Sequence, residues 1–163
     1  MVKRFIDIIA IMSRESAGWM VFGLLALIMA EVFTRYILRT SLLAADEIGA
    51  YMVVGITFLG LAHTWVEKSH IRIEFVIRHV TARARQWLRI ITLFMAAAIT
   101  MTLIWAGYEF VSYSHKIGKK SATVLEIPLQ YPEMVIGVGA LLVFIVIVAE
   151  LVTTVKATKN PKR

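Results

Sequence analysis

The chain has 163 residues, and 59% of them are hydrophobic, which exceeds the roughly half-apolar composition of soluble domains. It contains no cysteine, so disulfides, thiolate nucleophiles and cysteine metal sites are excluded. The net charge is +7, but Lys and Arg lie between the apolar runs, so we expect them to meet membrane lipids and not nucleic acid.

The start of the chain has the pattern of an amphipathic helix. Apolar side chains recur there at helical spacing beside charged ones, at Phe5, Ile8, Ile9 and Met12. The pattern predicts a helix in the headgroup plane, and a frayed extension of the first span is the alternative. Because Asp7 interrupts the apolar core that a signal peptide needs, we expect the first hydrophobic run to stay in the protein.

Four apolar stretches are long enough to cross a bilayer as helices, which takes about 20 residues. They cover residues 16–34, 48–66, 90–108 and 134–155. All three prolines lie outside them, so we expect continuous helices. The stretches also lack the alternating pattern of barrel strands.

A further apolar stripe lies between the second and third spans, at Ile73, Val76, Ile77 and Val80. Its helical spacing predicts an interfacial helix. The fold class is therefore an all-α membrane protein, a bundle of four transmembrane helices with an amphipathic N-terminal helix and this interfacial helix. We expect a single membrane domain over residues 1–163.

The orientation follows from the positions of Lys and Arg, which are retained on the cytoplasmic side of a membrane. If both termini and the middle loop lie on one side, that side holds 13 of the 18 basic residues. The other side holds five, at Arg35, Arg39, Lys116, Lys119 and Lys120. The sequence thus predicts cytoplasmic N and C termini.

Two ionisable residues lie near the end of the first span. Glu31 and Arg35 are four residues apart, so they can pair along one helix face. Charged groups inside a membrane are costly, and a functional alternative is that Glu31 binds a coupling cation or a charged group on a partner helix.

No cofactor or metal site is expected. The histidines allow a haem hypothesis, but His63 and His70 lie at one side of the membrane and His115 at the other. Spacings such as HExxH, catalytic triads and phosphate-binding loops do not occur, so we expect no enzyme. Unbroken spans without an internal repeat also argue against a complete secondary transporter.

Several short stretches occur in a fixed order along the four spans. Arg35 closes the first span, and Asp46 and Glu47 open the second in AADEIGAYMVVGITFLGLA, which includes Gly60. The cytoplasmic loop contains KSHIRIE around His70, and SATVLEIPLQYPEMVIG leads into the last span.

In this order of features the chain resembles the small membrane subunit (Q, DctQ-like) of tripartite ATP-independent periplasmic (TRAP) transporters. One departure is that an aromatic residue often precedes the acidic pair in this family, whereas Ala44 and Ala45 stand here. The resemblance, with the charges and glycines at span ends, suggests these subunit-interface or docking residues: Glu31, Arg35, Asp46, Glu47, Gly60, His70, Glu126, Pro128 and Gly137.

The resemblance implies a non-catalytic subunit that scaffolds a large multi-span TRAP membrane subunit in the bacterial inner membrane. It further implies sodium-coupled uptake of an organic acid, delivered by a periplasmic solute-binding protein. Two alternatives are a self-sufficient small carrier that oligomerises and a haem-bearing four-helix membrane protein.

Overall fold

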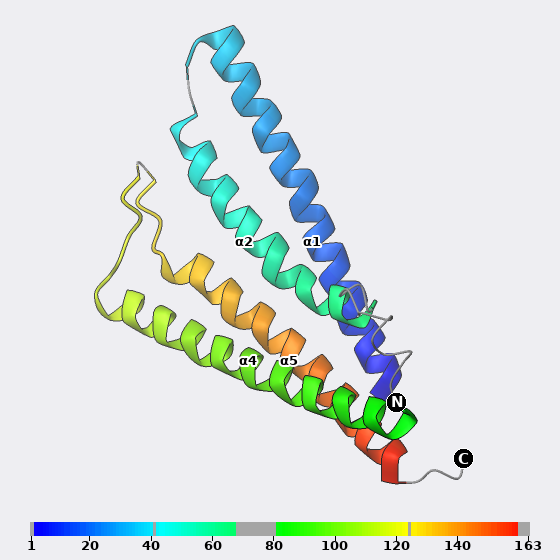
Figure 1. The fold of residues 1–163 in the computed structure, drawn as a ribbon. Coiled ribbons are helices and arrows are strands. Elements are labelled where there is room, and N and C mark those ends of the chain that lie inside the picture. The colour runs from blue at the N-terminus through cyan, green and yellow to red at the C-terminus, as the bar shows by residue number, and fades with distance from the viewer. Residues whose placement is uncertain (1, 41, 68–80, 124, 160–163) are drawn as a thin grey trace.

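The computed structural model describes residues 2–40, 42–67, 81–123 and 125–159. Four of its helices are long and apolar enough to cross a membrane, which confirms the four predicted spans (Figure 1). They are α1 (Val2–Phe33), α2 (Leu43–Val66), α4 (Ala82–Lys116) and α5 (Gln130–Lys159). The predicted interfacial helix at residues 73–80 lies outside the described residues.

The N-terminal segment is helical, as predicted, but it is not separate from the first span. α1 runs without interruption from Val2 to Phe33. Two of its early side chains explain this, because they pack on other spanning helices. Ile9 belongs to the buried apolar core, and the Ser13 hydroxyl donates a hydrogen bond to the backbone carbonyl of Leu59 in α2. The alternative, an extension of the first span, therefore describes α1 better.

α1 continues into a short π-helix, η1 (Thr34–Leu38), instead of ending after Phe33. Arg39 follows in the left-handed conformation, with a φ of 53°, and the Thr40 N–H donates to the Thr34 carbonyl at 3.3 Å. A left-handed residue of this kind commonly terminates a helix. The chain then turns back into α2 within a few residues.

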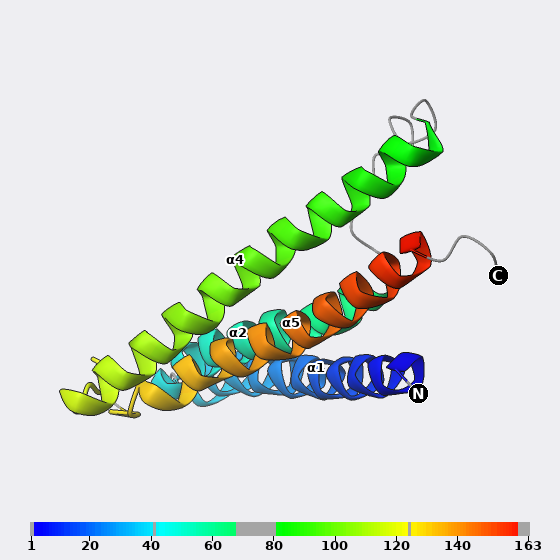
Figure 2. The same cartoon turned by 90° about the horizontal axis from the view of Figure 1, so that it is seen from below.

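The four helices pack in the order α1, α2, α5, α4, as an open row (Figure 1). Broad interfaces join each helix to its neighbour in this order, while α1 and α5 meet in few places. In Figure 2, α4 crosses the other three helices at an angle. Helices that follow each other in the chain therefore form two pairs, α1 with α2 and α4 with α5. The contact between α2 and α5 joins the two pairs.

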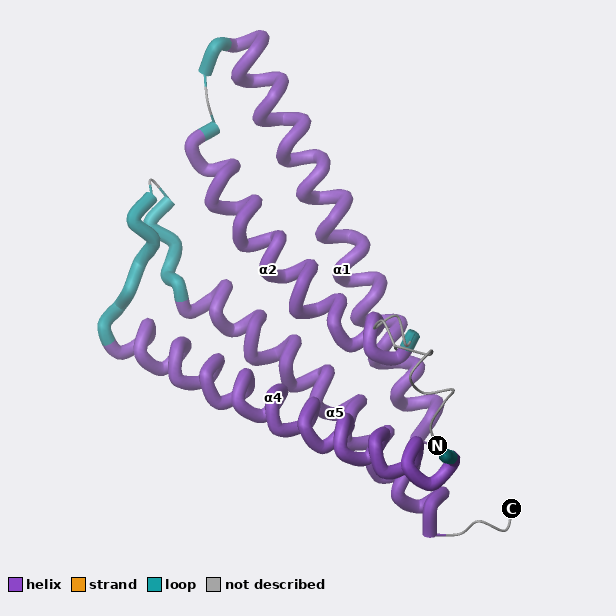
Figure 3. The backbone as a smooth tube through the Cα atoms, viewed as in Figure 1, coloured by secondary structure: helices purple, strands orange, loops and turns teal. Residues whose placement is uncertain are grey.

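Both chain termini lie at one end of the row, which we call the terminal end (Figure 1). The loops that join α1 to α2 and α4 to α5 lie at the opposite end, the loop end (Figure 3). The two pairs of helices diverge toward the loop end in the same view. This separation matches the predicted topology, in which the two termini share one side of the membrane.

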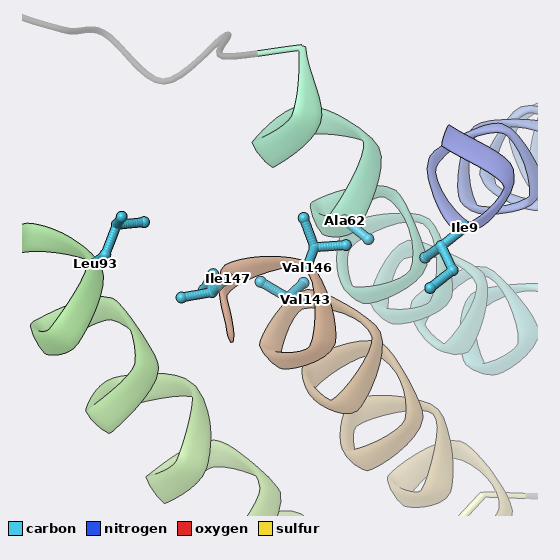
Figure 4. Packing of buried hydrophobic residues seen from close by; sticks show 6 residues of the cluster. All are labelled: Ile9, Ala62, Leu93, Val143, Val146 and Ile147. Carbon is cyan, nitrogen blue, oxygen red and sulfur yellow. The ribbon is translucent and has the colours of Figure 1, made fainter. Parts of the chain in front are cut away.

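The buried apolar core lies toward the terminal end and is centred on α5 (Figure 4). Its members come from all four helices: Ile9, Ala62, Leu93, Val143, Val146 and Ile147. Val146 lies beside Ala62 of α2, whereas Ile147 points toward Leu93 of α4 (Figure 4). α5 thus contacts helices on two sides, as its place inside the row requires.

Glycines allow the backbones to approach at two places along α5. A Cβ atom added at Gly139 would lie 2.5 Å from the carbonyl oxygen of Phe58 in α2. A Cβ atom added at Gly107 of α4 would lie 3.1 Å from the Cα of Gly137. Small residues at membrane helix contacts permit this close packing, which replaces hydrophobic burial as the source of association.

Candidate functional site

Glu31 joins the end of the first span to the beginning of α2. Its Oε1 accepts hydrogen bonds from Nη2 of Arg35 at 2.5 Å and from Nε at 3.1 Å, which confirms the predicted pairing. Its Oε2 accepts the backbone N–H of Leu42 at 2.8 Å. Leu42 is the N-cap residue of α2, so Glu31 satisfies a backbone donor that no helical carbonyl can reach. Both oxygens of Glu31 thus bond to groups of this chain, which supports a structural role for this residue.

Glu47 forms a second polar cluster at the loop end. It lies in the first turns of α2 and is only 7% exposed. Its Oε1 accepts a hydrogen bond from the Tyr51 hydroxyl at 2.6 Å, and its Oε2 accepts one from the Thr123 hydroxyl. Thr123 belongs to the loop between α4 and α5, so this contact joins segments that are 76 positions apart. The neighbouring Asp46 is exposed.

The loop between α4 and α5 has its own hydrogen-bonded structure. Its two arms pair at Lys120 and Pro128, with bonds from the Ser121 N–H to the Ile127 carbonyl at 2.9 Å and from the Leu129 N–H to the Lys119 carbonyl at 3.1 Å. We call residues 119–123 and 125–129 the hairpin loop.

Charged side chains lie on the outside of the hairpin loop. Lys120 and Glu126 form an exposed ion pair at 3.0 Å. Glu126, within the loop, has a positive φ angle of 44°, and Gly118, just before the loop, has one of 61°. For Gly118 such a conformation carries no Cβ penalty, and it allows the chain to leave α4 sharply.

A third polar cluster, which sequence reasoning missed, lies at the terminal end. Glu150 of α5 accepts a hydrogen bond from Nε1 of Trp65 in α2 at 2.9 Å. Its other oxygen accepts one from Nη2 of Arg89 in α4 at 2.8 Å. In the sequence Glu150 is the one acidic residue that interrupts the fourth span. That position is the feature from which a buried polar contact could have been predicted. One carboxylate thus joins three helices.

The two glycines among the predicted interface residues lie at contacts inside the row. A Cβ atom added at Gly60 would lie 3.6 Å from the Cβ of Ala17 in α1, and Gly137 is approached by Gly107. They therefore pack this chain's own helices together.

The remaining candidates occupy separate places. Glu126 and Pro128 share the hairpin loop, and both are exposed. His70 lies outside the described residues. The structure therefore brings the candidates into local groups and not into one site.

No group of three or more His, Asp or Glu residues arranged for a metal ion occurs in the part of the chain that the structure describes. His63 lies in the last turns of α2, at the terminal end. The ring of His115 lies near the loop end, where its Nδ1 is 2.9 Å from Oε1 of Gln130. These two imidazoles therefore do not face each other across the helices, as a haem ligand pair would.

Residues 24–157 match the family of the tripartite ATP-independent periplasmic transporters, DctQ component. The match spans most of the chain and includes Glu31, Glu47, the hairpin loop and Glu150. The chain belongs to the DctQ family. A search of curated proteins gave no match.

The family assignment makes this chain a small membrane subunit of a TRAP transporter and a multi-pass membrane protein. In this DctQ subunit the matched region begins within α1, so the first part of that helix precedes it. The polar clusters of the DctQ subunit all link its own segments. Their common chemistry is a carboxylate that accepts hydrogen bonds from another helix or loop.

Proposed function

We propose that this DctQ subunit is a non-catalytic scaffold beside the large membrane subunit of its transporter. The observation that carries the proposal is the open row of helices. Large apolar side chains are exposed along its outer helices, for example Trp19 and Phe22 on α1 and Phe94 and Trp105 on α4. A row exposes two broad faces to lipid or to another membrane protein, whereas a closed bundle of four helices has no such open side.

The geometry of the spans supports the same role. α2, α4 and α5 are continuous helices through their apolar stretches. Secondary transporters usually form midplane substrate sites from broken helices in repeated units, and these spans offer no unwound backbone for one. Substrate and ion sites are then the task of the large subunit. We propose sodium-coupled uptake of an organic acid, delivered by a periplasmic binding protein, as the activity of the whole system.

The proposed location is the bacterial inner membrane, with the terminal end in the cytoplasm. The excess of Lys and Arg in the termini and the middle loop supports this orientation. Cysteine labelling is a direct test because the chain has no native cysteine. An impermeant reagent should label Lys119→Cys in intact cells and should not label Gln86→Cys. The reverse pattern would refute the orientation.

Reconstitution tests the scaffold role. Proteoliposomes would contain this subunit alone, the large subunit alone, both, or both with the binding protein, under an inward sodium gradient. We expect uptake in the complete system only. Uptake by this subunit alone would support a self-sufficient carrier, and full uptake without it would show that the scaffold is dispensable.

A further inference from the structure

The hairpin loop is attached to α2 through a buried carboxylate. Glu47 is only 7% exposed, and its two oxygens accept hydrogen bonds from two hydroxyl groups, those of Tyr51 and Thr123. Ser121 extends the cluster, since its hydroxyl lies 2.8 Å from that of Thr123. A buried carboxylate is costly unless its oxygens accept hydrogen bonds, so each hydroxyl compensates part of that cost.

This attachment lies away from the buried apolar core. The core of buried apolar residues lies toward the terminal end, and the two pairs of helices diverge toward the loop end (Figure 1). Glu47 is on one pair and Thr123 belongs to the loop of the other. Their hydrogen bond therefore joins the two pairs across the diverging side.

We propose that Glu47 is a positioning residue, which holds the hairpin loop in a fixed orientation at the loop end so that its exposed charges can meet the soluble binding protein. This inference rests on the proposed function. Glu47 itself is too buried to contact a protein that docks from water. Lys120 and Glu126 are exposed on the hairpin loop, and a water-soluble partner is suited to such a polar surface.

The physical reason for the effect is preorganisation. A loop that is already fixed loses little conformational freedom when a partner binds, so the partner binds at lower concentration. Releasing the loop should therefore weaken the apparent affinity for the binding protein. It should leave the turnover of the assembled system unchanged, because no residue of the hairpin loop is placed in the substrate path.

The first measurement follows the loop directly. Spin labels at Thr40→Cys and Ala122→Cys, in the otherwise cysteine-free chain in nanodiscs, report the distance between the α1–α2 connection and the hairpin loop. We expect a narrow distance distribution in the parent and a broader one in Glu47→Ala and Thr123→Val. Thr123→Ser keeps the hydroxyl and should behave as the parent. Glu109→Gln neutralises an exposed carboxylate on α4 and is the matched control.

The second measurement separates docking from a merely structural role. Uptake by the complete system is recorded against the concentration of binding protein. We expect Glu47→Ala and Thr123→Val to raise the half-saturating concentration about three- to tenfold with an unchanged maximal rate. Thr123→Ser keeps the hydroxyl and should leave the half-saturating concentration at the parent value.

The outcomes distinguish the two proposals. Equal distance distributions in all variants would refute the positioning role of Glu47. A broadened distribution with an unchanged half-saturating concentration would refute the docking role of the hairpin loop and leave the scaffold intact. Full uptake in the absence of the DctQ subunit would instead refute the proposed function itself.

Discussion

The terminal end and the loop end of the helix row are held by different interactions. Toward the terminal end, apolar side chains of all four helices pack around α5, and Glu150 adds a polar link among three of them. At the loop end, polar contacts also join separate segments, from Glu31 to Leu42 and from Glu47 to Thr123. The pair α1 and α2 diverges from the pair α4 and α5 toward the loop end in Figure 1, whereas α4 separates from the other helices toward the terminal end in Figure 2.

The difference reflects what a bilayer allows. Lipid tails are as apolar as the side chains, so burial alone does not hold membrane helices together, and close packing and hydrogen bonds must. Close packing needs backbones that can approach, which Gly139 provides in the middle of the row. Near water a diverging pair can instead be joined by a polar loop. The packed part should therefore set the stability, and the loop end should set the shape of the exposed surface.

The largest effect is expected where two backbones touch. Gly139→Ala would place a Cβ atom 2.5 Å from the Phe58 carbonyl oxygen, and since neither backbone can rotate away, α2 and α5 must separate. We expect a loss of about 1–3 kcal/mol, typical of overpacking. Unfolding of the purified subunit in detergent measures it.

Gly18→Ala is the matched control for this substitution. A Cβ atom there meets nothing within 4 Å, so the change should be neutral or should stabilise α1 by about 0.5–1 kcal/mol. Equal losses for the two glycines would contradict the idea that backbone contact at α5 determines the stability of the row.

A second effect concerns the polar link at the terminal end. Glu150→Ala removes the acceptor for both Trp65 and Arg89, and we expect a loss of about 1–2 kcal/mol. Arg89→Ala should cost less than about 1 kcal/mol, because its side chain is 45% exposed and the pair is screened by solvent.

A double-mutant cycle of Glu150→Ala and Arg89→Ala in the same unfolding assay separates the two contacts. The Glu150→Ala loss should persist when Arg89 is already absent, because the Trp65 hydrogen bond is still removed. An Arg89→Ala loss as large as that of Glu150→Ala would show instead that the ion pair dominates.

The parts of this structure that sequence could predict are local. Four apolar stretches of sufficient length predicted four spanning helices, and the spacing of Glu31 and Arg35 predicted their ion pair. Both depend only on residues that are close in the chain. The observed helices are longer than the predicted spans because apolar length reports the membrane crossing, whereas a helix continues through polar residues at either side.

The contacts between distant segments were beyond such reasoning. Glu150 and Trp65 are 85 positions apart, and Glu47 and Thr123 are 76 apart. No periodicity relates these residues. To predict the contacts, one would first have to know which face of each helix packs on its neighbour. The same holds for Gly139, whose need to be small comes from the Phe58 backbone of another helix. Sequence showed that Glu47 was polar and near a span end, but not that it was buried.

The smallest effects on stability are expected at the end of the first span. There the two partners of one ion pair should differ in how much stability their removal costs. Arg35→Ala removes an exposed arginine from an i, i+4 pair and should cost only about 0.3–0.5 kcal/mol. Glu31→Ala also leaves the Leu42 N–H without its acceptor, so we expect about 1 kcal/mol, as for the loss of a helix cap. Detergent unfolding measures both.

Exchanging the two charges sharpens this comparison. A subunit with both Glu31→Arg and Arg35→Glu can form the ion pair again, so it should be more stable than either single reversal. It should still be less stable than the parent, because an arginine at position 31 has no oxygen to accept the Leu42 N–H. Full recovery in the double variant would mean that the ion pair alone matters and that the start of α2 does not need this acceptor. Equal losses in the double and single variants would mean that Glu31 and Arg35 act through separate partners.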